Sequence, residues 1–126
     1  MLGTGTLRSL TPISRLRGEI GVRHASGMRL SDDRIEAKLG ELPGWTREGE
    51  GIRRDFVFDG FASAVAFVVR TAFDAEAADH HPDILISSYK NVTLTLTTHS
   101  AGGITDKDFA AAAAADRVFA RWNAAR

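Results

Sequence analysis

Three of the four histidines in the sequence stand where they could take part in acid–base chemistry. His80 and His81 are adjacent and precede Pro82, and His99 follows a run of alternating threonines. An unperturbed imidazole titrates at about pH 6.5, so it can donate or accept a proton near neutral pH. Glu76 precedes His80 by four residues, and on one helix face its carboxylate would orient that ring or stabilise its charge. We therefore expect an acid–base site built from these residues.

A long helix and a strand must hold the histidines in place. Apolar residues recur at helical spacing between residues 61 and 79, namely Phe61, Ala64, Val65, Val68, Ala72 and Ala75. His81 precedes a proline, which disfavours helical geometry, so the helix should end there. Residues 91–99 alternate between apolar side chains and threonines, as in a half-buried strand. Period-two counting puts His99 on the threonine side, at the end of the strand and facing away from the core.

The remaining elements complete a small mixed fold. Ser31 should cap a first helix, and Thr105 should cap a last one. The apolar stripes of these helices are Ile35, Leu39 and Leu42 in the first, and Phe109, Ala112, Ala115, Phe119 and Trp122 in the last. Further strands are expected at residues 45–48, 52–58 and 84–88, with Gly49 and Gly51 in the first turn. The order predicts an α+β fold, a single-domain antiparallel four-stranded sheet with helices packed on one face.

Composition narrows the class of protein. A chain of 126 residues with 44% apolar content can bury one ordinary core. The charges of the 16 basic and 16 acidic residues cancel, so the chain has no net positive charge to attract phosphates, and direct nucleic-acid binding is not expected. The absence of cysteine excludes disulfides and thiolate metal sites, and no apolar run is long enough to cross a membrane. We expect a cytoplasmic protein that does not contact membranes.

Residues 1–27 differ from the rest of the chain. They carry Arg8, Arg15, Arg17 and Arg23 against a single acid, Glu19, and show no sustained periodicity. We interpret them as an N-terminal extension that is non-functional or reflects a mis-assigned start, since Met28 stands immediately before the first helix signal. An organelle transit peptide is the alternative. The domain then spans residues 28–126, and His24 in the extension is interpreted as a surface residue.

Residues 76–82 (EAADHHP), 92–99 (VTLTLTTH) and 102–105 (GGIT), followed by Asp108, occur in the order typical of one family. They resemble the pterin-4a-carbinolamine dehydratases, also called 4a-hydroxytetrahydrobiopterin dehydratases. The supporting positions are Phe56, Phe58, Phe61, Ala64, Phe67 and the step from Leu42 to Trp45, and the resemblance covers residues 29–120. The segment from Pro82 to Val92 is one residue longer than the family pattern, which predicts a changed turn or bulge near residues 87–90. Ile84 stands where some members have tryptophan.

The resemblance implies a lyase that removes water from 4a-hydroxytetrahydrobiopterin in tetrahydrobiopterin recycling, with no metal or organic cofactor. It implies His80, His81 and His99 as catalytic residues, of which His80 and His99 perform the acid–base work and His81 mainly holds the pterin. Which histidine is the acid and which the base stays open. The implied substrate-binding or orienting residues are Glu76, Asp79, Thr98 and Asp108. The resemblance also implies a homodimer or homotetramer, for which residues 92–98 are a plausible edge strand.

Two other functions remain as alternatives. Some relatives of the family act as non-catalytic dimerisation modules and transcriptional coactivators, but the three histidines together with Glu76 favour an enzyme here. Zinc binding is a minor alternative, because the adjacent pair His80-His81 lacks the i, i+4 spacing of a common two-histidine site. The phenylalanines at positions 56, 58, 61 and 67 follow strand and then helix periodicity, so they are predicted to be core residues.

Overall fold

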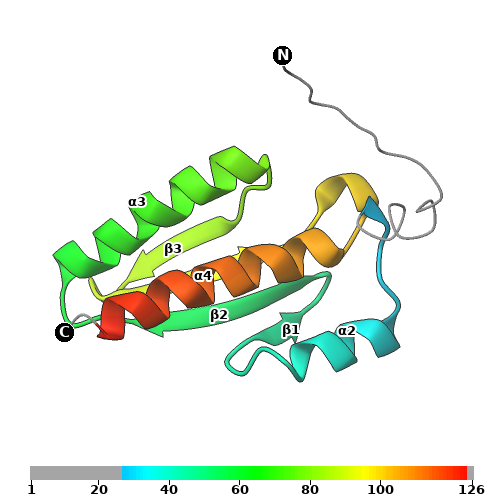
Figure 1. Cartoon of the computed structure of the whole chain (residues 1–126), viewed down its shortest axis with the longest axis horizontal. Helices are drawn as coiled ribbons and strands as arrows, with labels where there is room; N and C mark the ends of the chain where they lie inside the picture. The colour runs from blue at the N-terminus through cyan, green and yellow to red at the C-terminus, as the bar shows by residue number, and fades with distance from the viewer. Residues whose placement is uncertain (1–26, 125–126) are drawn as a thin grey trace, which may run out of the picture.

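The computed structural model describes residues 27–124, so the predicted extension lies outside the described residues except for Gly27 (Figure 1). Within this range the chain forms three α-helices, four strands and one short 3₁₀ helix. Their order is α2 (Asp32–Leu39), β1 (Thr46–Glu48), β2 (Gly51–Val57), α3 (Phe61–Ala78), β3 (Asp83–Ser87), β4 (Asn91–Leu96), η1 (His99–Ala101) and α4 (Asp106–Ala124). The predicted order of helices and strands is confirmed.

The four strands form one antiparallel sheet in the order β1-β2-β4-β3. In its register Phe56 pairs with Val92, and Ile84 pairs with Leu94. The expected α+β class is therefore confirmed. The prediction that residues 92–98 form an edge is wrong, because β4 lies inside the sheet and β1 and β3 form its edges. Alternation of apolar and polar residues distinguishes the two faces of a strand and does not report which strands lie beside it.

The long helices α3 and α4 lie across one face of the sheet (Figure 1). The apolar side of β4 is buried beneath them, and its threonines face the other side. The buried core consists of Ile35, Trp45, Ile52, Phe56, Phe58, Ala64, Phe67, Val92, Leu94, Leu96, Ile104, Phe109, Ala112, Ala115 and Val118. Phe56 is at the centre of its aromatic part, with ring centroids 4.9 Å from Phe67 and 5.1 Å from Phe119. Removal of this apolar surface from water is the main force that holds the helices on the sheet.

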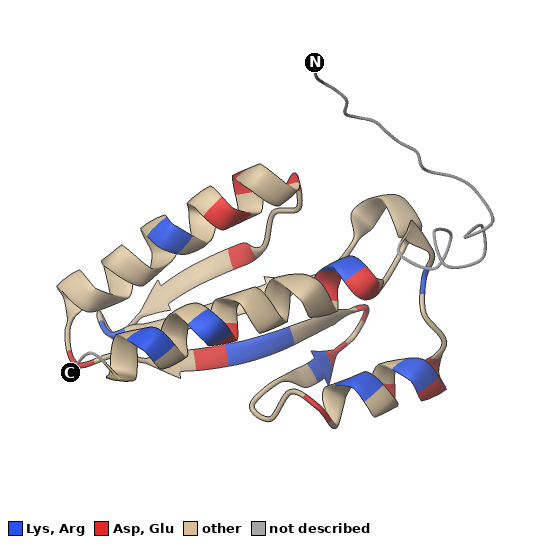
Figure 2. Cartoon of the chain, viewed as in Figure 1, with Lys and Arg blue, Asp and Glu red and all other residues tan. Residues whose placement is uncertain are grey.

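The face that α3 turns to the core differs in part from the predicted one. The buried residues are Ala64, Phe67, Thr71 and Ala75. Phe61 was expected in the core but is 57% exposed, and Ala72 is exposed as well. The helix is apolar on more than one side, so its periodicity alone does not decide which side is buried. Figure 2 shows that the first half of α3 carries no charged residue. Even so, no helix between residues 27 and 124 is long and apolar enough to cross a membrane.

Asp116 connects α4 to the hairpin that β1 and β2 form. Its carboxylate accepts a hydrogen bond from Trp45 Nε1 at 2.9 Å and pairs with Arg54 Nη1 at 2.7 Å. The Arg54 guanidinium also lies 4.5 Å from the centroid of the Phe56 ring. These contacts hold α4 in a defined position against β2, which matters because α4 begins at the candidate site.

Candidate active site

The C-terminus of α3 directs the two adjacent histidines in different directions. Asp79 takes the left-handed conformation (φ 51°, ψ 45°), which aspartate tolerates better than most residues. Its amide donates to the carbonyl of Glu76, and the amide of His80 donates to the carbonyl of Ala75 at 3.0 Å. This pattern is a Schellman motif, which ends the helix and turns the chain away from its axis. As a result, the His80 side chain is only 10% exposed, while that of His81 is 58% exposed.

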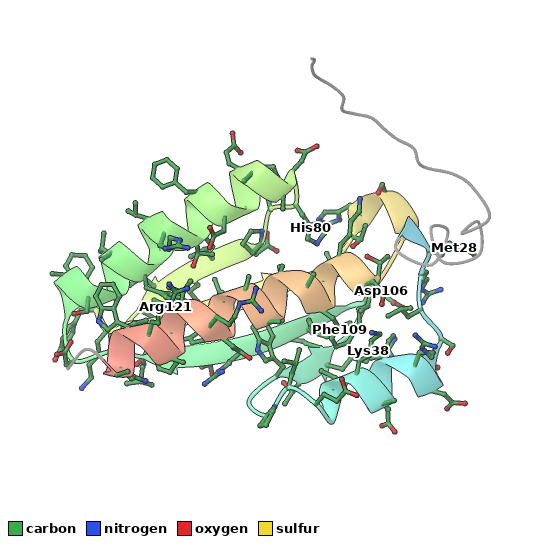
Figure 3. All side chains as sticks on the ribbon, in the orientation of Figure 1. Met28, Lys38, His80, Asp106, Phe109 and Arg121 are labelled. Atoms are coloured by element: carbon green, nitrogen blue, oxygen red, sulfur yellow. The ribbon has the colours of Figure 1, made fainter. Side chains whose placement is uncertain are left out.

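His80 reaches across to the start of α4. Figure 3 shows it between the end of α3 and the segment that leads into α4. Its Nε2 atom lies 2.6 Å from Oδ1 of Asp108, whose side chain is fully buried. The other carboxylate oxygen of Asp108 accepts hydrogen bonds from the Thr98 hydroxyl and from the Thr105 amide, both at 2.9 Å. A buried carboxylate with all these donors is held in one orientation.

The start of α4 explains why Asp108 stands there. Thr105 caps the helix as predicted, because its hydroxyl accepts from the Lys107 amide at 3.1 Å. In turn, the Asp108 carboxylate accepts a hydrogen bond from the Thr105 amide, and these two reciprocal bonds form a capping box. Thr98 and Asp108, which the resemblance implied as substrate-binding or orienting residues, are thus buried beneath His80 rather than exposed. The sequence interpretation did not assign Thr105 to the site, although its spacing from Asp108 was the available signal.

Glu76 pairs with His81 instead of His80. Glu76 Oε1 lies 2.7 Å from His81 Nε2, and both side chains are exposed. The predicted pairing with His80 required the helix to continue to that residue, but the left-handed Asp79 ends it first. Asp79, the other implied substrate-binding residue of this segment, is exposed at the helix end and makes no hydrogen bond to the three candidate histidines. The helix end therefore presents an exposed carboxylate–imidazole pair beside the buried one.

His99 lies outside β4, in the short helix η1. The strand ends at Leu96, and the backbones of Thr98 and Gly103 pair with each other, which closes a tight loop. Gly102 completes the loop with a φ of 75°, a conformation suited to glycine. His99 is exposed, so the prediction that it faces away from the core is confirmed, although it does not belong to the strand.

Two hollows border the candidate residues. One lies between α3, α4 and the sheet, is lined mainly by alanines and leucines, and includes His80 and Pro82. The other is lined by His99 with Glu48, Glu50, Gly51, Thr95, Thr97, Gly102 and Gly103, and the two glutamates are residues that the sequence interpretation did not select. Thr98 lies between the two hollows, because it precedes His99 in the chain and its hydroxyl donates to the Asp108 carboxylate, which binds His80. Between residues 27 and 124, no group of three histidine, aspartate or glutamate side chains is placed to hold a metal ion.

Comparison with known proteins identifies the family. The family model of pterin 4 alpha carbinolamine dehydratase matches residues 28–118. A protein of Roseiflexus sp. (strain RS-1), named provisionally as a pterin-4-alpha-carbinolamine dehydratase, is 58% identical over 90 residues, covering 71% of this chain and 96% of the relative. A protein of Mycobacteroides abscessus with the same provisional name is 52% identical over 92 residues, covering 73% and 97%. A crystal structure from Brucella melitensis, described as a transcriptional coactivator/pterin dehydratase, aligns with a TM-score of 0.68 and 35% identity over 71% of this chain and 97% of that one. The chain therefore belongs to the pterin-4-alpha-carbinolamine dehydratase family.

Proposed function

We propose that the chain is a lyase that dehydrates pterin-4a-carbinolamine, the 4a-hydroxytetrahydrobiopterin, to the quinonoid dihydropterin in tetrahydrobiopterin recycling. The observation that carries this proposal is the contact between His80 Nε2 and the buried carboxylate of Asp108 at 2.6 Å. A carboxylate in this position holds an imidazole ring in one orientation, which suits the ring for proton transfer. Membership of the family supplies the class of substrate.

The reaction needs two proton transfers. The bond between C4a and the hydroxyl oxygen breaks, a carbon–nitrogen double bond forms, and the hydroxyl leaves as water after it receives a proton. A second group removes a proton from a ring nitrogen. Nothing is oxidised or reduced, so one group that donates a proton and one group that accepts a proton balance the step. We assign these transfers to His80 and His99, in either order.

The exposed pair of His81 and Glu76 supports a binding role for that end of the helix. A pterin presents N–H donors along its pyrimidine edge, and a carboxylate is the natural acceptor for such donors. Glu76 Oε1 is already hydrogen-bonded to His81 at 2.7 Å, so the two side chains form one preoriented polar surface. We assign His81 mainly to holding the pterin, with Glu76 and Asp79 beside it.

The proposal is tested by the decay of 4a-hydroxytetrahydropterin, generated in situ and followed by stopped-flow absorbance. The wild-type protein should accelerate the decay, and His80→Ala and His99→Ala should each lower turnover by roughly 100-fold or more, as expected for a lost general acid or base. Arg117→Ala, an exposed position on α4, is the control and should retain full turnover. If the folded wild-type protein leaves the decay rate unchanged, the dehydratase function is refuted.

We further propose that the active form is a homodimer or homotetramer. On α3 the side chains of Phe61, Val69 and Phe73 are 57%, 49% and 70% exposed. Exposed apolar side chains grouped on one helix are typical of a protein–protein contact. The strand β3 is a second candidate contact, because it is an edge strand and Leu85 is exposed on it. Light scattering after gel filtration should show an oligomer for the wild type and a smaller species for Phe73→Glu.

A non-catalytic role remains as the second candidate function. Its support is the description of the Brucella melitensis structure as a transcriptional coactivator as well as a pterin dehydratase. A binding module of that kind needs neither an acid nor a base. It would therefore keep its partner binding in the His80→Ala variant, whereas the enzyme would lose turnover in the stopped-flow assay.

A further inference from the structure

We propose that Asp108, held by Thr98 and Thr105, fixes His80 in the tautomer protonated at Nε2, so that Nδ1 is the atom that exchanges a proton with the substrate. The inference rests on the proposed function for the identity of the substrate. It adds two threonines as positioning residues and names the reacting nitrogen. The geometry around the carboxylate supports each step.

The first step concerns the hydrogen bond between His80 and Asp108. Its two heavy atoms lie 2.6 Å apart, a short distance for a charge-assisted bond. A carboxylate accepts hydrogen bonds and does not donate them, so the proton of this bond belongs to Nε2. A neutral imidazole carries one N–H, and Nδ1 therefore keeps its lone pair. In the imidazolium form, Nδ1 carries the proton that can be donated.

The second step concerns the direction of the hydrogen bonds behind the carboxylate. The Thr98 hydroxyl has one proton, and it is used in the bond to Asp108 Oδ2. The contact of 2.8 Å between the hydroxyls of Thr98 and Thr105 must then be donated by Thr105. The Thr105 oxygen is left to accept from the Lys107 amide at 3.1 Å. Every donor in this chain points toward Asp108, which leaves Oδ1 free for His80.

Burial makes this arrangement rigid. Thr98 is 5% exposed, and Thr105 and Asp108 are fully buried. Water cannot easily replace a lost donor there, and hydrogen bonds in such surroundings are stronger than in water. Both threonines are buried, so neither is expected to contact the pterin. They act through Asp108 on the orientation of the His80 ring, as supporting residues do around other catalytic imidazoles.

The tautomer is measured directly by nitrogen NMR of the His80 ring, with ¹⁵N-labelled histidine and a pH at which the ring is neutral. We expect the wild-type protein to show a protonated Nε2 and an unprotonated Nδ1. In Asp108→Asn the amide oxygen should take the place of Oδ2, because the Thr98 hydroxyl and the Thr105 amide both need an acceptor there. The new NH₂ group then faces Nε2, and the ring should switch to the Nδ1-protonated form. A wild-type ring protonated at Nδ1, or a ring unchanged in Asp108→Asn, overturns the proposal.

Kinetics test the two threonines independently. Thr98→Val and Thr105→Val should each lower kcat by roughly 10-fold or more with little change in KM, because they loosen the ring without touching the substrate. Thr98→Ser and Thr105→Ser, which keep the hydroxyl, should restore most of the loss. Thr93→Val is the matched control, since Thr93 lies on β4 and its hydroxyl, like that of Thr98, donates to an aspartate, here Asp55 at 2.7 Å. It should leave kcat unchanged.

The two experiments separate the possible failures. If the wild-type protein does not dehydrate the pterin, the proposed function fails, while the NMR measurement still decides the tautomer. If the protein is active but the valine variants of Thr98 and Thr105 keep full kcat, or the serine variants fail to rescue a loss, the positioning role is refuted. Circular dichroism identifies any variant that does not fold. If a valine variant fails to fold, the serine variant at the same position provides the kinetic comparison. A kcat close to that of the wild type then supports the role of the hydroxyl, and a loss as large as that expected for valine refutes it.

Discussion

Phe67 and Phe73 lie on the same helix, α3, and provide a direct test of which helix face holds the fold together. Phe67 is fully buried, while Phe73 is 70% exposed. The Phe67 ring lies 4.9 Å from that of Phe56 and 5.1 Å from that of Phe58, measured between centroids. Replacing each phenylalanine by alanine changes helix propensity equally, so the difference between the two variants reports burial alone.

The expected magnitude follows from these contacts. Removing a buried phenylalanine side chain costs about 3–5 kcal/mol, which includes the cavity that remains and the lost ring contacts. A domain of this size has a total stability of about 5–15 kcal/mol, and each 1 kcal/mol shifts the Tm by about 4–8 °C. Phe67→Ala should therefore lower the Tm by about 12–40 °C. Phe73→Ala should change the free energy of unfolding of a protomer by no more than about 0.5 kcal/mol.

Urea unfolding, followed by circular dichroism and by tryptophan fluorescence, measures both variants. The titrations should be repeated at several protein concentrations, because a contact between subunits makes the midpoint depend on concentration. A loss for Phe73→Ala that is present at high protein concentration and shrinks on dilution would place Phe73 at an interface between copies. A loss below about 1.5 kcal/mol for Phe67→Ala, or equal losses for both variants at low concentration, would refute the assigned core face of α3.

Three further predictions concern other parts of the fold. Asp116→Ala leaves the indole and guanidinium that it binds without their acceptor, and should lower the unfolding free energy by about 1–3 kcal/mol in urea titrations. The hydrogen bond from Arg47 holds the pKa of the Asp32 carboxyl below its ordinary value of 3.8. The pair between Asp32 and Arg47 therefore stabilises the folded state at pH values above 3.8, and this stabilisation is lost as the pH falls through the lowered pKa of Asp32. The difference in urea midpoint between wild type and Asp32→Asn should therefore be present at neutral pH and vanish in strong acid. Gly102→Ala places a side chain at a φ of 75° with no neighbour within 4 Å, so it should cost about 1–2 kcal/mol of unfolding free energy from backbone strain alone.

Features set by short stretches of chain were predictable from the sequence. Ser31 and Thr105 were expected to cap helices, and each does so with its hydroxyl. The proline after His81 indicated that α3 ends beside the histidines, and the structure ends the helix at Ala78. Capping, helix termination and strand alternation depend on backbone hydrogen bonds and side-chain direction over a few residues, and this information is present in the local sequence.

Features set by contacts between distant segments were decided only by the tertiary structure. The pairing of β4 with both β2 and β3 removed it from the edge, although its alternation looked the same in either position. Likewise, α3 turns Phe67 to the core and leaves Phe61 exposed, because the sheet and α4 select one of its apolar sides. Periodicity describes the faces of an element, while the choice of the neighbour that each face meets belongs to the packing of the whole domain.

The candidate site shows the same division. The sequence by itself determined which residue types are present and that His80 stands at a helix end. It could not determine that His80 meets Asp108 while Glu76 meets His81, because a left-handed Asp79 changes the direction of the chain between them. The partner of His80 lies 28 residues further along the chain, and it arrives there because α4 packs against the sheet next to the end of α3. Proximity between such distant residues follows from the burial of the common core, which no short segment encodes.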